Sequence, residues 1–407
     1  MDGARLVSLN AREAAYEALL ASLRHEDFIV SSLKRWQNKD HPSPRDFAFA
    51  YEIASGAARM ALSLDYIATQ LSDNKKLSLK VKEKALLRAA LYQYYFMTKV
   101  PLYAIVNETV ELAKKYCHRS FVGYLNALLR RLENTTLQLP EDLSVPSLSI
   151  RYSYPSYFIA KLISDYGQET AINVLKAGNT SPITTARMRS EAKTIWIDDP
   201  SQIQQIAEST DYYIQNATPI DLINELASRT KSPASILDLC SSPGGKLLAA
   251  HDIFPEAQLF ANDVSEEKIK RLSENLTKYG VKATLTCGDG SLYPNDRSFD
   301  VVILDVPCSN SGVLNKRHEA RWRLTEDALK ELKVTQQKLL QNSVKLIGSE
   351  GIIWYLTCSI LKDENERLLQ ELCSGFGLEI VYTKTILPNE NGWDGGFAAL
   401  LNRHKRA

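Results

Sequence analysis

The sequence of 407 residues lacks three things: an excess of one charge, closely spaced cysteines and long apolar runs. Its 49 lysines and arginines balance 48 acidic residues, which excludes a protein that condenses nucleic acid through a basic coat, although local basic patches are compatible with this balance. The six cysteines lie far apart without a CxxC pair. We therefore expect free thiols, with neither a disulfide framework nor a bound metal.

The sequence also lacks targeting and membrane signals. Residues 1–10 have no apolar segment of the kind found in secretory signals. No run approaches the ~18 uninterrupted apolar residues of a membrane span. We expect a cytoplasmic, monomeric protein without a membrane partner.

Residues 11–133 have the apolar spacing of helices. Ala15, Leu19 and Leu23 recur at intervals of four residues, and Leu87 and Leu91 repeat this spacing. We predict an all-α domain over residues 1–140. Residues 135–149 are polar, contain two prolines and have no periodicity, so we expect a linker there. A small α+β subdomain then extends to about residue 215, which makes 141–215 the second predicted region.

Clustered basic residues in the helical region allow two interpretations. They can form a solvated helix surface or a patch that contacts RNA phosphates. The cluster contains Lys75, Lys76, Lys80, Lys82, Lys84, Arg88, Lys114, Lys115, Arg119, Arg130 and Arg131.

Residues 216–407 alternate between short apolar runs and amphipathic stretches. Runs such as ILDLC, FDVVILDV and GIIWYLTC are separated by helical patterns, the longest from residue 325 to 347. This alternation predicts an α/β domain with a doubly wound parallel sheet. In such sheets, ligands bind beyond the carboxyl ends of the strands.

The first predicted strand leads into a glycine turn that suits a cofactor. Adjacent glycines let the backbone approach a ligand, and the following helix offers free N–H groups. The turn matches neither GxGxxG nor a nucleotide triphosphate loop. The predicted cofactor-binding residues of this turn are Cys240, Ser241, Ser242, Pro243, Gly244, Gly245 and Lys246.

Three acidic residues follow three further predicted strands. Asp263 is placed to accept the ribose hydroxyls of a nucleoside-containing cofactor, and Asp289 to hold an adenine amino group. Each can instead cap a helix. Asp305 is the third acid at a strand end. We expect S-adenosylmethionine rather than NAD, because no second phosphate site is evident.

Cys308 and Cys358 each end a buried strand on the face where the cofactor is expected. A cysteine is usually a small buried hydrophobe. Two at this edge instead suggest methylation of pyrimidine C5, in which a thiolate adds to C6 and makes C5 nucleophilic. Asp305 is placed to hydrogen-bond the ring. Spacing alone leaves open which cysteine attacks.

The motifs DLCSSPGGK, NDVS, DVPCSNSG and YLTCSILKDENE together resemble the RNA 5-methylcytosine methyltransferase family. The stretch RAALYQYYFMTKVPLYAIVNETVELAKK resembles the NusB-type RNA-binding domain. The combination is similar to bacterial 16S rRNA cytosine-C5 methyltransferases with a NusB-like extension. The family usually has GTG where Asn310, Ser311 and Gly312 stand.

The resemblance implies a Rossmann-like S-adenosylmethionine-dependent methyltransferase domain after a NusB-like domain and a small linking subdomain. It implies that Cys358 is the nucleophile, that Cys308 assists release of the product, and that Asp305 contacts both cofactor and substrate. The implied partner is small-subunit ribosomal RNA. Two alternatives stay open: the same chemistry on tRNA or another RNA, and a non-catalytic RNA-binding factor that keeps the fold.

Overall fold

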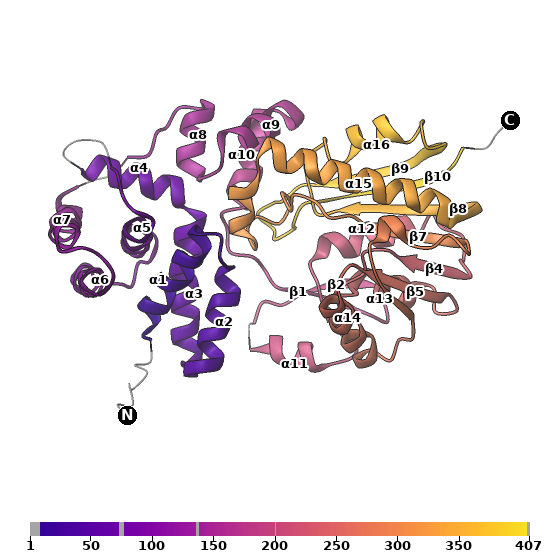
Figure 1. The fold of residues 1–407 in the computed structure, drawn as a ribbon, viewed down its shortest axis with the longest axis horizontal. Helices are drawn as coiled ribbons and strands as arrows, with labels where there is room; N and C mark the ends of the chain where they lie inside the picture. Colours follow the sequence, from indigo (N-terminus) through magenta and orange to yellow (C-terminus); the bar gives the residue numbers. More distant parts are fainter. Residues whose placement is uncertain (1–8, 73–76, 136–137, 200, 405–407) are drawn as a thin grey trace. The chain divides into compact units, whose positions relative to one another are not determined.

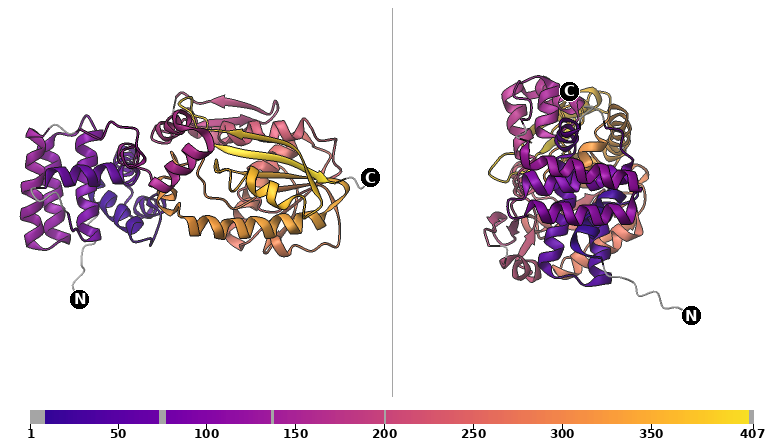
Figure 2. Two further views of the ribbon diagram at one scale, coloured as in Figure 1. Left: turned by 90° about the horizontal axis from the view of Figure 1, so that it is seen from above. Right: turned by 90° about the vertical axis from the view of Figure 1, so that its left-hand side faces the viewer.

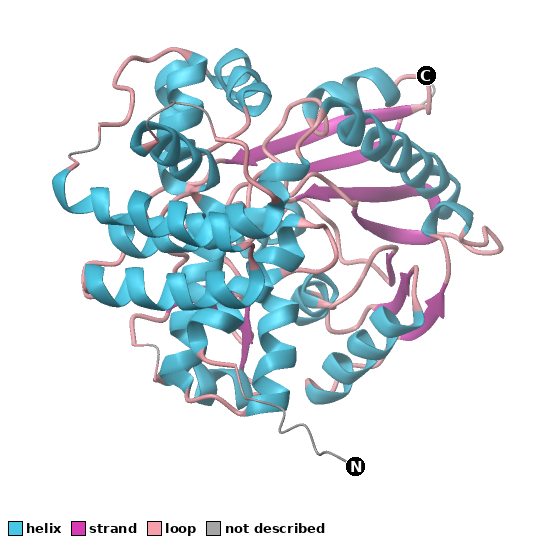
Figure 3. Cartoon of the chain, turned by 60° about the vertical axis from the view of Figure 1, so that its left-hand side comes forward, coloured by secondary structure: helices cyan, strands magenta, loops and turns pink. Residues whose placement is uncertain are grey.

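The computed structural model describes residues 9–72, 77–135, 138–199 and 201–404. The chain divides into two compact units, Met1–Ala160 and Lys161–Ala407. The first unit is helical, whereas all the strands drawn in Figures 1 and 3 belong to the second. No helix among the described residues has both the length and the apolar character needed to cross a lipid bilayer.

The first unit is a bundle organised around a central helix, α5. Leu86, Leu87, Ala90 and Leu91 on α5 are all at most 2% exposed and belong to one continuous core. At Gly56 of α3 a side chain would overlap the ring of a tyrosine on α5, so glycine is required for this close approach of the two helices. The elements are α1 (Ala11–Leu23), α2 (Ile29–Asp40), α3 (Pro44–Arg59), α4 (Ala61–Leu71), α5 (Val81–Phe96), α6 (Leu102–Tyr116), α7 (Arg119–Arg130), η1 (Arg131–Asn134) and α8 (Val145–Tyr152), followed by α9 (Ser156–Tyr166), which runs into the second unit.

The predicted linker over residues 135–149 is wrong in its last part, because α8 begins inside it. The side chain of Ser144 caps this helix by accepting a hydrogen bond from the Ser147 backbone N–H at 3.3 Å. Pro146 stands in the first turn, where a helix tolerates a residue without an N–H. The polar, proline-containing sequence was therefore a helix start.

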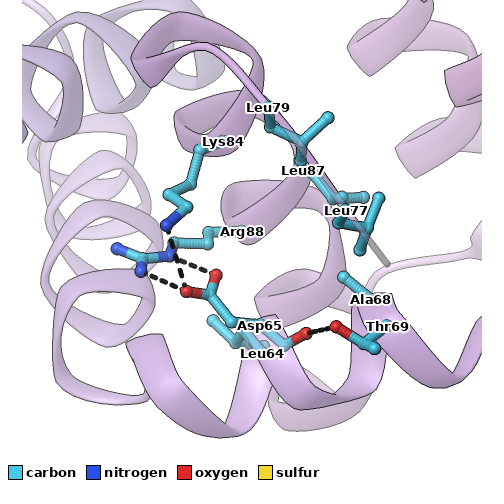
Figure 4. A pocket seen from close by; sticks show the side chains of 9 residues that line it. All are labelled: Leu64, Asp65, Ala68, Thr69, Leu77, Leu79, Lys84, Leu87 and Arg88. Carbon is cyan, nitrogen blue, oxygen red and sulfur yellow. Dashed lines mark hydrogen bonds and ion pairs between the residues drawn. The ribbon is translucent and has the colours of Figure 1, made fainter. Parts of the chain in front are cut away.

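Part of the basic cluster is neutralised within the helical unit. Figure 4 shows Asp65 beside a small cavity of about 90 Å³, where it pairs with Lys84 and Arg88. Arg88 donates two hydrogen bonds to Asp65, at 2.8 and 2.7 Å, and is itself buried. Lys84 and Arg88 therefore serve the fold, whereas Arg119 and Arg130 are exposed. Lys75 and Lys76 lie outside the described residues.

The second unit begins with helix α10 (Gln168–Ala177) and a small antiparallel sheet in the order β2-β1-β3. Arg187 lies in β1 and Arg189 just after it, and both form ion pairs with Asp252 of helix α13 (Gly245–Ile253). Because Arg187 is only 1% exposed, this buried ion pair joins the small sheet to helix α13. The elements are β1 (Thr185–Met188), β2 (Lys193–Trp196), α11 (Gln202–Glu208), β3 (Tyr212–Ile214) and α12 (Ala217–Ala227).

The described residues then form a seven-stranded sheet in the order β6-β5-β4-β7-β8-β10-β9. The pairings from β6 to β8 are parallel, as predicted, whereas β10 runs antiparallel to both neighbours. The elements are β4 (Ser235–Asp238), α13 (Gly245–Ile253), β5 (Gln258–Asp263), α14 (Glu266–Lys278), β6 (Thr284–Cys287), η2 (Gly290–Leu292), β7 (Phe299–Asp305), η3 (His318–Arg323), α15 (Glu326–Leu346), β8 (Ile347–Thr357), α16 (Glu366–Leu372), β9 (Leu378–Ile386) and β10 (Gly396–Arg403).

Alternate side chains of the central strands face two different cores. Val301 and Ile303 pack with α12, α13 and α14, whereas Val302 and Leu304 pack with α15 and α16. Figure 2 shows α15 along one face of the sheet. Both faces are thus covered, which explains the continuous apolar runs. The chain leaves β4 toward β5 and later returns to its other side at β7, so the topological switch point lies between β4 and β7.

Candidate active site

The register of β7 and β8 brings the two predicted cysteines together. Asp305, the last residue of β7, lies opposite Leu356 of β8. The segments that leave these parallel strands emerge at one edge of the sheet, and the Sγ atoms of Cys308 and Cys358 are 3.1 Å apart. Both cysteines are half-buried.

Hydrogen bonding distinguishes the two thiols. The hydrogen bond with Cys358, burial and the neighbouring negative charges together raise the pKa of Cys308 well above its usual range. Cys308 therefore ionises less readily than a free thiol. The Cys358 thiol also donates to Oδ1 of Asn310 at 3.2 Å. Asn310 itself has a left-handed backbone (φ 59°), which asparagine tolerates better than most residues.

Asp305 forms an ion pair with Lys246, which stands at the start of α13. Burial lowers the pKa of Lys246, but its ion pair with Asp305 outweighs this effect and the pKa is raised overall. The charge of the Cys358 side chain acts on the same ammonium group. The predicted residues Lys246, Asp305 and Cys358 therefore share one electrostatic environment.

Asp238, which ends β4, is a site residue that the sequence analysis did not select. It is 1% exposed, and its Oδ2 has no hydrogen-bond partner among the described residues. Burial, followed by the charge of Asp305, raises its pKa to about 7. The signal that could have revealed it is the one used for the other acids: a carboxylate that ends an apolar strand before the glycine turn.

The predicted cofactor turn runs from β4 into α13. Gly244 has φ +103°, a conformation that favours glycine. At Gly245 a Cβ would lie 2.8 Å from the ring of Tyr213, so this position also requires glycine. Burial raises the pKa of Cys240, the first residue of the turn, so its thiol stays protonated.

Asp263 is buried beside this turn. Its carboxylate accepts hydrogen bonds from the backbone N–H groups of Ser242, at 2.9 Å, and Val264, at 2.7 Å. Lys268 of α14 forms an ion pair with it at 3.0 Å. Asp263 therefore holds the turn in place, in addition to any role toward a cofactor.

Asp289 lies after β6, at the same edge of the sheet. Its side chain accepts from the backbone N–H of Ser291 at 2.9 Å and so caps η2. The helix-cap interpretation of this acid is therefore correct for the structure described here. The exposed carboxylate does not contact the cysteines, and its role toward a cofactor stays a prediction.

Comparisons with known proteins find similar sequences for both units of the chain. Residues 226–376 match the family model for the 16S rRNA methyltransferase RsmB/F, and residues 9–134 match the NusB family. The chain is 29% identical over 397 residues to the ribosomal RNA small subunit methyltransferase B of Photorhabdus laumondii, covering 88% of this chain and 91% of the relative. The protein of the same name from Shigella sonnei is 26% identical over 431 residues, covering 96% of this chain and 98% of the relative.

Solved structures support the fold. The protein PH0851 aligns with a TM-score of 0.74 at 19% identity, over 98% of this chain and all of that chain. A methyltransferase homolog protein from Pyrococcus horikoshii aligns with a TM-score of 0.55 at 20% identity, over 65% of this chain and all of that chain. Sequence and fold thus confirm the predicted NusB-like and Rossmann-like fold, and the chain is similar to RNA methyltransferases of the RsmB/F type over residues 226–376 and to the NusB family over residues 9–134.

Proposed function

We propose that the protein transfers a methyl group from S-adenosylmethionine to C5 of a cytosine in small-subunit ribosomal RNA, through a covalent bond between Cys358 and C6. The observation that carries this proposal is the pair of thiols 3.1 Å apart, at the ends of neighbouring strands, beside the Lys246–Asp305 ion pair. Methylation at a sulfur or nitrogen atom would need no thiol at this place. Attack by C5 of a pyrimidine does, because the free ring is too weakly nucleophilic.

The residues of the first turn fit the cofactor. Gly244 and Gly245 let the turn pack closely against Leu272 and Tyr213, and the free N–H groups at the start of α13 favour a negatively charged group such as a carboxylate. The unpartnered Oδ2 of Asp238 suits a hydrogen-bond donor such as an amino group, and Asp263 suits ribose hydroxyls. When bound, S-adenosylmethionine supplies an electrophilic methyl group. We assign Cys240–Lys246, Asp263, Asp289 and Asp305 to its binding.

The two cysteines have different roles in this proposal. The Cys358 thiolate adds to C6, and the electron pair of the C5–C6 bond becomes available at C5. Asp305 hydrogen-bonds the ring as charge builds on it, while Lys246 orients the acid. After methyl transfer a base from the solvent takes the C5 proton, the electron pair of the C5–H bond re-forms the C5=C6 double bond, and the C6–S bond breaks so that Cys358 leaves as a thiolate. Cys308, which keeps its own proton, donates a hydrogen bond to the departing sulfur.

The identity of the substrate rests on different support from the chemistry. The relatives named small subunit methyltransferase B match this chain over nearly its whole length, including the NusB-like domain. We therefore propose that small-subunit ribosomal RNA is the partner and that the protein acts on it in the cytoplasm. The same thiol pair could act on a cytosine of tRNA, so the assay must include both RNAs.

The direct test is methyl transfer from labelled S-adenosylmethionine to small-subunit RNA, with tRNA as the competing substrate. Digestion of the product should yield labelled 5-methylcytosine from the ribosomal RNA alone. Label in tRNA alone would reassign the substrate. Label in another nucleoside would reject C5 chemistry.

Two variants then assign the cysteines. Cys358→Ala should abolish methyl transfer and form no covalent RNA adduct. Cys308→Ala should still attack and transfer the methyl group, but should release its product slowly. It should therefore give a slowly migrating protein–RNA band on a denaturing gel, which the double variant lacks. The reverse pattern would make Cys308 the nucleophile, and activity in both variants without adducts would remove covalent catalysis.

A further inference from the structure

A single buried carboxylate, Glu364, lies between the two segments that carry the cysteines. Its Oε1 accepts from the backbone N–H of Ser309 at 2.9 Å. Its Oε2 accepts from the hydroxyl of Ser359 at 2.6 Å and also from the hydroxyl of Ser309. Ser309 directly follows Cys308, and Ser359 directly follows Cys358. One side chain therefore holds the neighbour of each thiol.

The residues around Glu364 complete this network. Gln336 of α15 donates to Oε1 at 3.2 Å and to the carbonyl oxygen of Pro307, just before Cys308, at 2.9 Å. Asn365 accepts from the hydroxyl of Thr357, just before Cys358, at 2.7 Å. The residues on both sides of each thiol are thus tied to one buried hydrogen-bond network.

The environment of Glu364 is unusual for an acidic residue whose only role is structural. Glu364 is fully buried, and no ion pair joins it in the described part of the chain. Its two carboxylate oxygens accept four hydrogen bonds, from Ser309, Ser359 and Gln336. Burying a charge without a counter-ion is costly, and a network of this kind is stable only when every member is satisfied. An apolar residue would be cheaper if the only need were to fill this space.

We propose that Glu364 is a positioning residue, whose carboxylate fixes the separation of the Cys308 and Cys358 sulfur atoms by joining the segments that follow them. The proposal rests on the thiol chemistry proposed above. In that chemistry Cys308 must reach the Cys358 sulfur when it leaves C6, and a separation that drifts by an ångström would lose this hydrogen bond. The pKa of Cys308 is raised by its hydrogen bond with Cys358, by burial, by the charge of Cys358 and, to a smaller extent, by the charge of Glu364. The carboxylate of Glu364 therefore also acts on Cys308 through space.

The primary variant is Glu364→Gln, which keeps the shape, removes the charge and cannot accept both serine hydroxyls in the same way. Glu364→Ala removes the network altogether. Glu366→Gln is the matched control: it makes the same chemical change two residues away, at a side chain that accepts from Thr385 and contacts neither thiol segment. Circular dichroism and thermal unfolding of the full chain identify the variants that retain the fold. If Glu364→Ala does not fold, the results for Glu364→Gln alone decide whether Glu364 is a positioning residue.

The first readout reports the sulfur separation without RNA or cofactor. Diamide oxidises two nearby thiols to a disulfide, and takes up the two electrons and two protons that they lose. Peptide mapping follows the Cys308–Cys358 disulfide over time. We expect it to form about 10- to 100-fold more slowly in Glu364→Gln than in the wild type, and within about twofold of the wild-type rate in Glu366→Gln. Equal rates in all three proteins would overturn the proposal, even if RNA methylation itself were absent.

The second readout tests the charge. In a Cys358→Ala background, the pH dependence of alkylation at Cys308, followed by peptide mapping because other free cysteines are present, reports the pKa of Cys308 without its coupling to Cys358. Removing the nearby negative charge in Glu364→Gln should move the alkylation midpoint to lower pH, whereas Glu366→Gln should leave it unmoved. If Glu364 acts only through structure, the alkylation midpoint of Cys308 should not shift. An unchanged midpoint would therefore show that the charge of Glu364 does not act on Cys308.

The third readout concerns turnover. Glu364→Gln should lower kcat for RNA methylation by about tenfold or more, with the KM for S-adenosylmethionine within about twofold of wild type. A change in KM alone would place Glu364 in cofactor binding and overturn the positioning role. If no protein, wild type included, methylates RNA, the proposed function fails, while the disulfide rates still decide the role of Glu364.

Discussion

Replacing Asp238 by asparagine should remove a specific pH dependence from the stability of the second unit. Asp238 is 1% exposed, lies at the end of β4 and has a pKa of about 7, against its usual 3.8. Burial is the larger cause and the charge of Asp305 the next. The side chain therefore stays protonated in the folded protein at pH values where the unfolded chain has already released the proton.

The sign and size follow from proton linkage. Below about pH 4 both states hold the proton, and Asp238 has no effect on pH dependence. Between about pH 4 and 7 the unfolded chain binds fewer protons than the folded one, so stability falls as the pH rises. A shift of about three pKa units, at about 1.4 kcal/mol per unit, amounts to about 4 kcal/mol of lost stability once the pH exceeds about 7.

Urea unfolding at several pH values between 5 and 8 measures this effect. Trp36 is the only tryptophan in residues 1–160, so a Trp36→Phe background restricts the fluorescence change to residues 161–407. As the pH rises, the free energy of unfolding of Asp238→Asn should increase relative to that of its parent. The new amide can also change stability by an amount that is the same at every pH. Parallel pH curves for the two proteins would refute the reasoning.

A second substitution tests the cause of the shift. Asp305→Asn removes the neighbouring negative charge that raises the pKa of Asp238. In that background, the difference in free energy of unfolding caused by Asp238→Asn should change less with pH, because only burial then opposes the ionisation of Asp238. An unchanged pH dependence would mean that the two carboxylates do not interact.

The remaining predictions concern the cofactor, RNA affinity and a buried ion pair. Asp263→Ala should weaken S-adenosylmethionine binding measured by calorimetry, because two hydrogen bonds of about 1.5–3 kcal/mol each are lost; unchanged affinity would move the ribose contact elsewhere. Arg119→Glu with Arg130→Glu should lower RNA affinity and reduce the salt slope by about one per lost phosphate contact, and an unchanged slope would favour a solvated surface. Asp252→Ala leaves Arg187 buried without its carboxylate partner and should destabilise the second unit by about 3–5 kcal/mol in thermal unfolding, so an unchanged melting temperature would contradict the role of this pair.

The sequence predicted those parts of the fold that depend on local patterns. Apolar spacing gave the helical unit, and alternating apolar runs gave the parallel strands β4 to β8. The last two strands, β9 and β10, were not predicted. Their segments follow β8, and the antiparallel pairing of β10 with β8 joins residues far apart in the chain, such as Phe397 and Thr357. A pairing of this kind has no local signature.

Charge patterns were harder to interpret than apolar ones. The sequence shows Lys84 and Arg88 as two members of a basic cluster, but it cannot show that both face Asp65 on the preceding helix. Likewise, it showed Asp289 after a strand without deciding between a cap and a ligand. In each case the partner of the charged group is fixed by packing between helices or by a loop, which single-sequence patterns do not determine.

The candidate site shows the same division between chemistry and geometry. The residue types at the strand ends were enough to select Cys308 and Cys358, because a thiol at that edge of a parallel sheet has few structural reasons to be there. Their contact depends on more: on the register of β7 against β8 and on the buried network around Glu364. Sequence alone gave no reason to select Glu364, since an acid near a helix start is ordinary. It becomes informative only when its burial, its lack of a counter-ion and its two serine partners are seen together. A residue that acts by placing others is therefore recognised from the network that it holds.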